Sequence, residues 1–148
     1  MPDAPSYRIN ECRFNLPHAD VQDASINILK FAELGTSLIV SRSVLGESET
    51  LRSNFDAQLE RLQQQVQALR FEPVQTLSVG TQNNIEALEL RSEFNKGDAR
   101  VFQYQLTFLV PGTRQMQALS YVKAEPLGDE ESMHWETIKA SLQFEATR

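Results

Sequence analysis

The feature that most constrains this chain is one long amphipathic segment, residues 48–70 (SETLRSNFDAQLERLQQQVQALR). Its apolar residues recur at spacings of three and four, which is the period of one helix face and not of a strand. They are Leu51, Phe55, Leu59, Leu62, Val66 and Leu69. Ser48 is the expected N-cap, and Pro73 stops the segment soon after Arg70. We therefore expect one long helix whose apolar stripe packs on a sheet.

A coiled coil is the alternative for this segment. From Phe55 onward the apolar residues fit the a and d positions of a heptad repeat. The fit lasts only about two heptads, whereas sustained coiled coils show three to four. Gln58 and Gln65 lie beside the stripe, so they would border any surface that the helix leaves uncovered.

The rest of the chain predicts an antiparallel sheet. Segments of alternating apolar residues occur on both sides of the long helix, and short turns such as residues 95–98 join most of them. The expected strands are residues 7–16, 25–31, 37–41, 74–79, 85–94, 100–110 and 115–123. A second, shorter helix should begin with Asp129 as its N-cap and carry Trp135 on its apolar face. The 148 residues then form a single α+β domain, a two-layer sandwich whose two helices cover one face of the sheet.

Composition argues against several classes of function. The formal net charge is −6, which does not suit nucleic acid or an anionic membrane surface. No apolar run approaches the roughly 18 residues of a membrane span, and the first residues lack the regions of a secretory signal. The single cysteine, Cys12, excludes an internal disulfide and a cysteine-based zinc site. We therefore expect a cytoplasmic protein.

The sequence contains no recognisable catalytic machinery. It has no P-loop, no dinucleotide-binding glycine motif and no nucleophile elbow. His18 and His134 have no ligand partner one helical turn away, and Cys12 has no evident base. The acidic run 129–131 is explained as the start of a helix, where negative charge is favourable. We expect no enzymatic activity, no metal and no cofactor.

The two strands before the long helix are apolar on both faces, although one face covered by helices would need only one apolar side. The alternation predicts that four residues share one face: Ile26, Ile28, Leu38 and Val40. The opposite face would carry Leu29, Phe31 and Ile39. One face packs on the helices, and the other needs a partner chain, a ligand, a loop or the N-terminal segment to cover it.

Glutamines accompany this apolar surface. Gln103 and Gln105 alternate on the less apolar side of a neighbouring strand. Glutamine can bond exposed backbone carbonyls without the desolvation cost of a charge. The combination would suit an apolar helix whose small residues allow close approach.

Six segments together resemble a known family. They are FNLP, SINILKF, SLIVSR, GESETLRSNFDAQLERL, FQYQLTFLV and ESMHWETIKASLQF. In order and spacing they resemble the Eag family, effector-associated chaperones of bacterial type VI secretion systems, over nearly the whole chain. The resemblance implies a Mog1/PsbP-like sandwich and a homodimer whose concave sheet surfaces bind helices. It also implies that the protein shields the N-terminal transmembrane (PAAR) region of an effector from water and helps to load the effector on the secretion spike.

The resemblance and the helix pattern together indicate the residues of this groove. They are Ile26, Ile28, Leu38, Val40, Gln58, Leu62, Gln65, Val66, Gln103 and Gln105. Leu62 and Val66 are equally compatible with the core. The alternative function is a small binding module of the same fold with a non-effector partner, in the cytosol or as a periplasmic or photosystem-type protein. The sequence leaves open the effector, the dimer geometry and the face that forms the groove.

Overall fold

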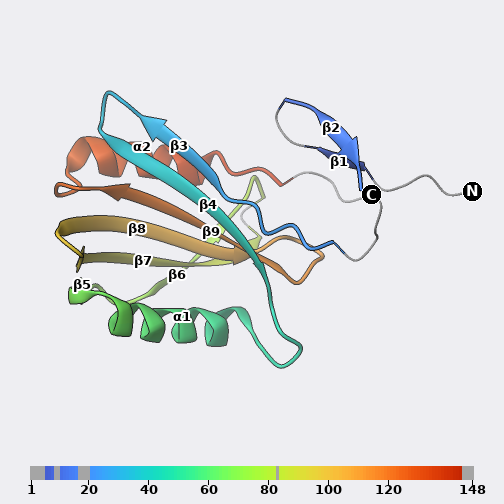
Figure 1. Ribbon diagram of the computed structural model, residues 1–148, viewed down its shortest axis with the longest axis horizontal. Coiled ribbons are helices and arrows are strands. Elements are labelled where there is room, and N and C mark those ends of the chain that lie inside the picture. The colour runs from blue at the N-terminus through green and yellow to red at the C-terminus, as the bar shows by residue number, and fades with distance from the viewer. Residues whose placement is uncertain (1–5, 9–10, 17–20, 83, 145–148) are drawn as a thin grey trace, which may run out of the picture.

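The computed structural model describes residues 6–8, 11–16, 21–82 and 84–144 (Figure 1). In these residues the strands are β1 (Ser6–Arg8), β2 (Arg13–Asn15), β3 (Asn27–Phe31), β4 (Thr36–Val44), β5 (Gln67–Phe71), β6 (Gln75–Val79), β7 (Ile85–Lys96), β8 (Ala99–Leu109) and β9 (Gln115–Lys123). The helices are α1 (Leu51–Gln65) and α2 (Asp129–Ala140).

The main body is a seven-stranded sheet of order β3-β4-β9-β8-β7-β5, in which β6 also pairs with β7. All its pairs are antiparallel. β1 and β2 form a separate two-stranded sheet. The predicted α+β class, an antiparallel sheet packed by one longer and one shorter helix, is therefore confirmed.

The start of α1 is set by a threonine cap. The Thr50 hydroxyl accepts a hydrogen bond from the Ser53 amide at 3.1 Å, and the Ser53 hydroxyl accepts one from the Thr50 amide at 2.9 Å. This reciprocal pair satisfies amide groups that the first helical turn leaves unbonded. The predicted cap, Ser48, is wrong by two residues. In α2 the N-cap is Gly128 rather than the predicted Asp129.

The end of α1 comes earlier than predicted. Val66 is extended, although its amide still donates to the Leu62 carbonyl at 3.1 Å. Residues 67–71 then become β5 and pair with the edge of β7. The prediction of a helix up to Arg70 is wrong, because the sheet edge satisfies the backbone groups that another helical turn would have satisfied.

Most predicted strands lie within a few residues of the observed ones, and residues 115–123 match β9 in full. The predicted first strand, residues 7–16, is wrong. The described parts of this segment form the hairpin of β1 and β2, in which Tyr7 pairs with Phe14. The segment contains two short strands that pair with each other, so it adds no strand to the main sheet.

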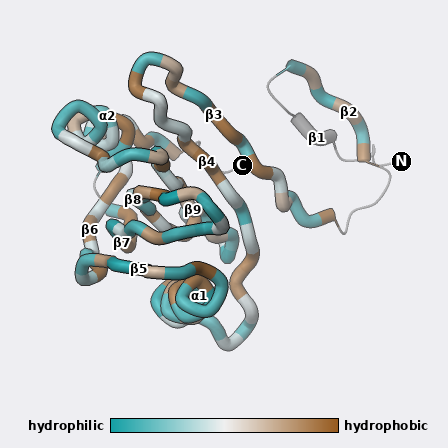
Figure 2. Tube along the Cα trace, turned by 60° about the vertical axis from the view of Figure 1, so that its left-hand side comes forward, coloured by the Kyte–Doolittle hydropathy of each residue, from teal (hydrophilic) through white to brown (hydrophobic). Residues whose placement is uncertain are grey.

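The two helices pack on opposite faces of the sheet (Figure 2). Ala87 of β7 belongs to the core cluster of Trp135 in α2, whereas its neighbour Leu88 belongs to the cluster of Phe55 in α1. Successive strand residues point to opposite faces, so the sheet has an α1 face and an α2 face. A helix packed on the sheet, as on either face here, is consistent with a two-layer α+β sandwich. The prediction that both helices cover one face is wrong.

Candidate functional site

The α1 face is only partly covered by its helix. Leu51 and Phe55 of α1 pack in one cluster with Leu88 and Leu90 of β7 and with Met116 of β9. Beyond this cluster, a row of paired residues runs along the α1 face across five neighbouring strands. The row is Ile28, Ile39, Ser120, Gln105 and Leu90. The exposed fraction is 2% at Leu90 beside α1 and 58% at Ile28 on the sheet edge. We call this open surface, bordered by α1 on one side, the α1-face groove.

The floor of the α1-face groove is small, amide-bearing or apolar. One flanking row is Lys30, Ser37, Val122, Gln103 and Ser92. The other row is Ser41, Ala118, Thr107 and Leu88; its last three members are buried, so this row borders the packed cluster under α1. Lys30, on the edge strand, is the charged residue of these three rows. Gln103 Nε2 donates to Gln105 Oε1 at 3.0 Å, and Gln105 Nε2 donates to Thr107 Oγ1 at 3.3 Å. These bonds form a ladder that holds both amides along the floor.

A hollow of about 260 Å³ lies where α1 meets this floor. It is lined by Phe55, Gln58, Leu59, Arg61, Leu62, Gln65, Leu90, Gln103 and Gln105. Five of the sequence-predicted site residues therefore lie together, from α1 and β8. Gln58 Nε2 is held by Asn54 Oδ1 at 2.7 Å, which orients this amide within the helix wall.

The predicted pairing of β3 with β4 is wrong by one residue. Ile28 pairs with Ile39, while Leu29 pairs with Leu38, so Ile28 and Leu38 lie on opposite faces. Leu38 is buried in the α2-face core, and Val40 packs against the same core. The reason is the turn: β4 begins at Thr36, which the sequence analysis placed outside the strand, and a one-residue change of register reverses every side chain.

The remaining predicted residues lie at the margins of the α1-face groove. Ile26 precedes β3 and is 62% exposed. Val66 is half-buried at the end of α1 and does not line the hollow beside Gln105. Ser120 was not predicted, and Ile39 was grouped with Leu29 and Phe31, whereas it lies on the face of Ile28. No signal in the sequence marks Ser120, because only its pairing with Ile39 and Gln105 brings it to the centre.

The α2 face holds a buried ionic cluster that sequence reasoning also missed. Glu89 is 4% exposed and accepts hydrogen bonds from Trp135 Nε1 at 2.6 Å and from Lys139 Nζ at 2.9 Å to each oxygen. The guanidinium of Arg91 lies 4.4 Å from the centre of the Tyr104 ring. The carboxylate is bonded to two side chains of α2, so we interpret the cluster as an anchor for this helix.

A second polar contact anchors the start of α2. Lys123 Nζ donates to Glu131 Oε1 at 2.7 Å. This bond lowers the pKa of the Glu131 carboxyl and raises the pKa of the Lys123 ammonium. Burial raises the pKa of the Tyr121 phenol on the same face, because a buried phenolate would lose its hydration.

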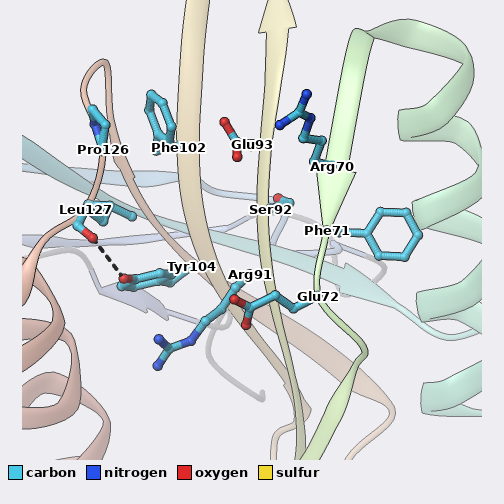
Figure 3. Close-up of a pocket in the computed structure, with 10 residues that line it drawn as sticks. All are labelled: Arg70, Phe71, Glu72, Arg91, Ser92, Glu93, Phe102, Tyr104, Pro126 and Leu127. Carbon is cyan, nitrogen blue, oxygen red and sulfur yellow. Dashed lines mark hydrogen bonds between the residues drawn. The ribbon is translucent and has the colours of Figure 1, made fainter.

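A further hollow, of about 390 Å³, lies between β5, β7, β8 and the loop before α2 (Figure 3). Its lining residues are Arg70, Phe71, Glu72, Arg91, Ser92, Glu93, Phe102, Tyr104, Pro126 and Leu127. The Tyr104 hydroxyl bonds to the Leu127 carbonyl at 3.4 Å and to the Ser132 hydroxyl at 2.9 Å. Glu93 is paired with Arg100 at 2.7 Å. Charges of both signs and these internal pairs make it a weaker candidate than the α1-face groove.

Within the described ranges, no three His, Cys, Asp or Glu side chains gather in a way that could hold a metal ion. No helix in these ranges has the length and apolar character needed to cross a bilayer.

Fold and groove define a small α+β protein with an antiparallel sheet that is half open on one face. The sequence profile of the DcrB family matches residues 11–141, so the chain belongs to the DcrB family. A solved structure that resembles it is described as "Crystal Structure of Protein of Unknown Function PA94 from Pseudomonas aeruginosa, Putative Regulator". The TM-score is 0.76 and the identity 17%, over 99% of this chain and 100% of that one, which shows a shared fold. No curated protein matches the sequence.

Proposed function

We propose that this protein is a chaperone and adaptor for a type VI secretion effector. It would bind the effector's N-terminal transmembrane region in the cytosol, shield it from water without using ATP, and help to load the effector on the secretion spike. The proposal combines the resemblance to the Eag family, with its Mog1/PsbP-like fold, and one structural observation. That observation is the α1-face groove, which is open, largely uncharged and bordered by amide side chains.

The dimensions of the α1-face groove suit a helix. From β3 to β8 there are three strand spacings of about 4.8 Å, or roughly 14 Å, and a helix with its side chains is about 10 Å wide. Ser37 and Ser120 are small, so a helix backbone could approach the floor closely. Ile28 and Ile39 would cover its apolar side chains.

The amides would supply the polar part of recognition. Gln58 and Gln103 line the same hollow from the helix wall and from the floor. A bound helix with Gly, Ala or Ser at the contact exposes backbone carbonyls, which a glutamine amide can bond. A transmembrane segment released into water exposes about 20 apolar residues, and binding alone lowers the free exposed population. If the protein is a homodimer, its two grooves would hold two helices with avidity.

The test is co-expression with the N-terminal region of the effector encoded beside this protein. Wild type should give a soluble complex, and Ile28→Asp should weaken binding at least about tenfold, because it would bury an unpaired carboxylate. Leu29→Asp is the matched control: it changes the next residue of the same strand, which is 51% exposed but lies on the α2 face. Thermal melting of the free proteins shows that both variants are folded.

The outcomes separate the site from the function. Equal binding by Ile28→Asp and Leu29→Asp would reject the α1-face groove. A different result is that the bound partner contains no apolar helix and that Ile28→Asp, but not Leu29→Asp, abolishes its binding. This result would support the α1-face groove as the binding site. It would favour the general binding module over the effector chaperone.

A further inference from the structure

The hairpin of β1 and β2 stands apart from the main body (Figure 1). Its strands pair with each other and belong to a separate two-stranded sheet. An isolated two-stranded hairpin is marginally stable at best in water, so it needs a surface to pack on.

The described chain from Phe14 in β2 to Leu29 in β3 carries many exposed apolar side chains. Of the eight large apolar side chains that are exposed in the described ranges, five fall between residues 14 and 29. They are Phe14, Val21, Ile26, Ile28 and Leu29. Phe14, Leu16 and Val21 also line a hollow of about 250 Å³ at the base of the hairpin. Several exposed apolar side chains near the start of β3 mark an interaction surface, with Ile28 and Leu29 on opposite faces of this edge strand.

The sheet of the main body has an open edge in the same region. Among the described strands, β3 is the terminal strand of the seven-stranded sheet and pairs with β4 alone. Four of its five residues are exposed. An edge strand presents unpaired backbone groups to which another strand can add.

Hydrogen bonds set the direction in which the N-terminal segment leaves this edge. Arg42 Nη1 donates to the Ser25 carbonyl at 3.2 Å and to Asn27 Oδ1 at 2.7 Å, which fixes the start of β3 against β4. The Ser25 amide bonds to Asp23 Oδ1 at 3.0 Å. Figure 1 shows the hairpin beyond the start of β3 rather than beside its edge.

We propose that two copies of this chain exchange these arms, so that the β1–β2 hairpin of each copy packs on the β3 edge of the other. A second copy is the occupant that fits this edge, because its hairpin supplies β-strands and the β3 edge offers strand pairing. The α1-face groove, by contrast, offers room for a helix. Reciprocal exchange about a two-fold axis gives the hairpin a support and the edge a partner, and it closes the assembly at two chains. The α1-face groove stays open on the face of the sheet, so the arm exchange does not depend on the proposed function.

The single cysteine provides a direct test. Cys12 is exposed and lies just before β2 in the hairpin. A maleimide photo-crosslinker is attached to Cys12 in a co-refolded mixture of ¹⁴N- and ¹⁵N-labelled full-length chains. Mass spectrometry should find cross-links from Cys12 to residues 21–31, with light and heavy chains joined. The control, Cys12→Ser with Thr113→Cys, places the probe in the exposed turn before β9 and should give no such cross-links.

Each contrary result rejects the exchange. Cross-links to residues 21–31 within chains of one label only would show that the hairpin folds back on its own β3. A dimer without cross-links to this segment would place the interface elsewhere, and a monomeric mass would exclude an exchanged dimer altogether.

A variant pair gives an independent measurement. Phe14→Asp should raise the dimer dissociation constant at least tenfold in sedimentation experiments, whereas Met133→Asp, which changes a 71% exposed residue of α2, should not. Unchanged dimerisation of Phe14→Asp would contradict the exchange. A monomeric protein that still binds the effector helix would reject the arm exchange alone, and a cross-linked dimer that binds no helix would reject the proposed function alone.

Discussion

Two neighbouring rows of the same strands face opposite sides of the sheet and have different chemistry. On the α2 face the row is Leu29, Leu38, Tyr121, Tyr104 and Arg91, and on the α1 face it is Ile28, Ile39, Ser120, Gln105 and Leu90. The first row is large and aromatic at its centre, whereas the second is small and amide-bearing there. The strands therefore supply a packed core on one side and an open floor on the other.

The tyrosine hydroxyls on the α2 face are hydrogen-bonded within the protein. The Tyr121 hydroxyl lies 2.7 Å from His134 Nδ1, and the Tyr104 hydroxyl lies 2.9 Å from Ser132 Oγ. The side chain of Trp135, on α2, is fully buried in the core cluster that α2 forms with these strands. On the α1 face the glutamines bond mainly to each other, at the rim of a hollow. We infer that changes on the α2 face alter stability, while changes on the open part of the α1 face alter binding.

The largest effect should follow from breaking the ionic cluster of the α2 face. Lys139→Met removes the two short contacts to the buried Glu89 carboxylate and leaves it the more distant Arg91 Nη2, at 3.7 Å, as its cation, so it should lower the free energy of unfolding by about 3 kcal/mol. Urea unfolding measures the loss. The double variant Glu89→Gln with Lys139→Met should recover part of it, since a neutral amide still accepts from Trp135. Arg61→Met, an exposed residue of α1, should change stability by less than about 0.5 kcal/mol.

The same kind of enlargement should act differently on the two faces. Ala87→Leu overfills the buried α2-face core and should cost about 1–3 kcal/mol in urea unfolding. Ser120→Leu adds the same side chain to the open floor and should change stability by less than about 0.5 kcal/mol, while weakening helix binding about tenfold. Similar losses of stability in both variants would show that the α1-face floor is packed, which would undermine the comparison.

A smaller effect is expected at the start of α1, which forms the wall of the α1-face groove. Thr50→Ala removes the capping hydroxyl and should lower stability by about 1 kcal/mol. Ser48→Ala changes a nearby exposed serine that does not cap the helix, and should leave the melting temperature unchanged. Equal effects of the two substitutions would contradict the observed cap.

The smallest effect concerns pH. Because the pKa of Glu131 is lowered by Lys123, the ionised pair stabilises the fold above the ordinary value of 4.5, and this contribution is lost as the pH falls through the lower folded value. The melting temperature of wild type should exceed that of Glu131→Gln at neutral pH, and the difference should shrink below pH 4.5. Glu60→Gln, on α1, serves as the control. If the difference in melting temperature stayed constant with pH, the ionised Glu131–Lys123 pair would not be the source of the stabilisation.

Periodicity was sufficient to predict the element types but not their ends. The three-and-four spacing identified α1, yet Val66 and Leu69 continue that spacing into a turn and a strand. The positions of these two apolar residues are compatible with a helix and with a strand. The spacing therefore does not decide between helix and strand when a sheet edge is available for pairing. The polar anchors of α2 were equally hidden, because Glu89 looks like any solvent-facing residue of an alternating strand until α2 covers it.

The candidate site was predicted in part. Gln58 and Gln65 were found from the helix wheel, and Gln103 and Gln105 from strand alternation, since each of these patterns is local. Leu62 entered the set through the family resemblance. The set of Ile28, Leu38 and Val40 was wrong, because their common face depended on the register of β3 with β4. That register follows from where the turn ends, which a single residue, Thr36, decides.

The sequence by itself determined the α+β class, the antiparallel connections and the amphipathic stripe of α1, because these follow from local periodicity and turn residues. Only the tertiary structure decided that the helices lie on opposite faces, that Ile28 and Ser120 belong to one floor, and that Glu89 is enclosed. These features depend on which strands meet and in which register, and the pairing energy is shared between segments far apart in the chain.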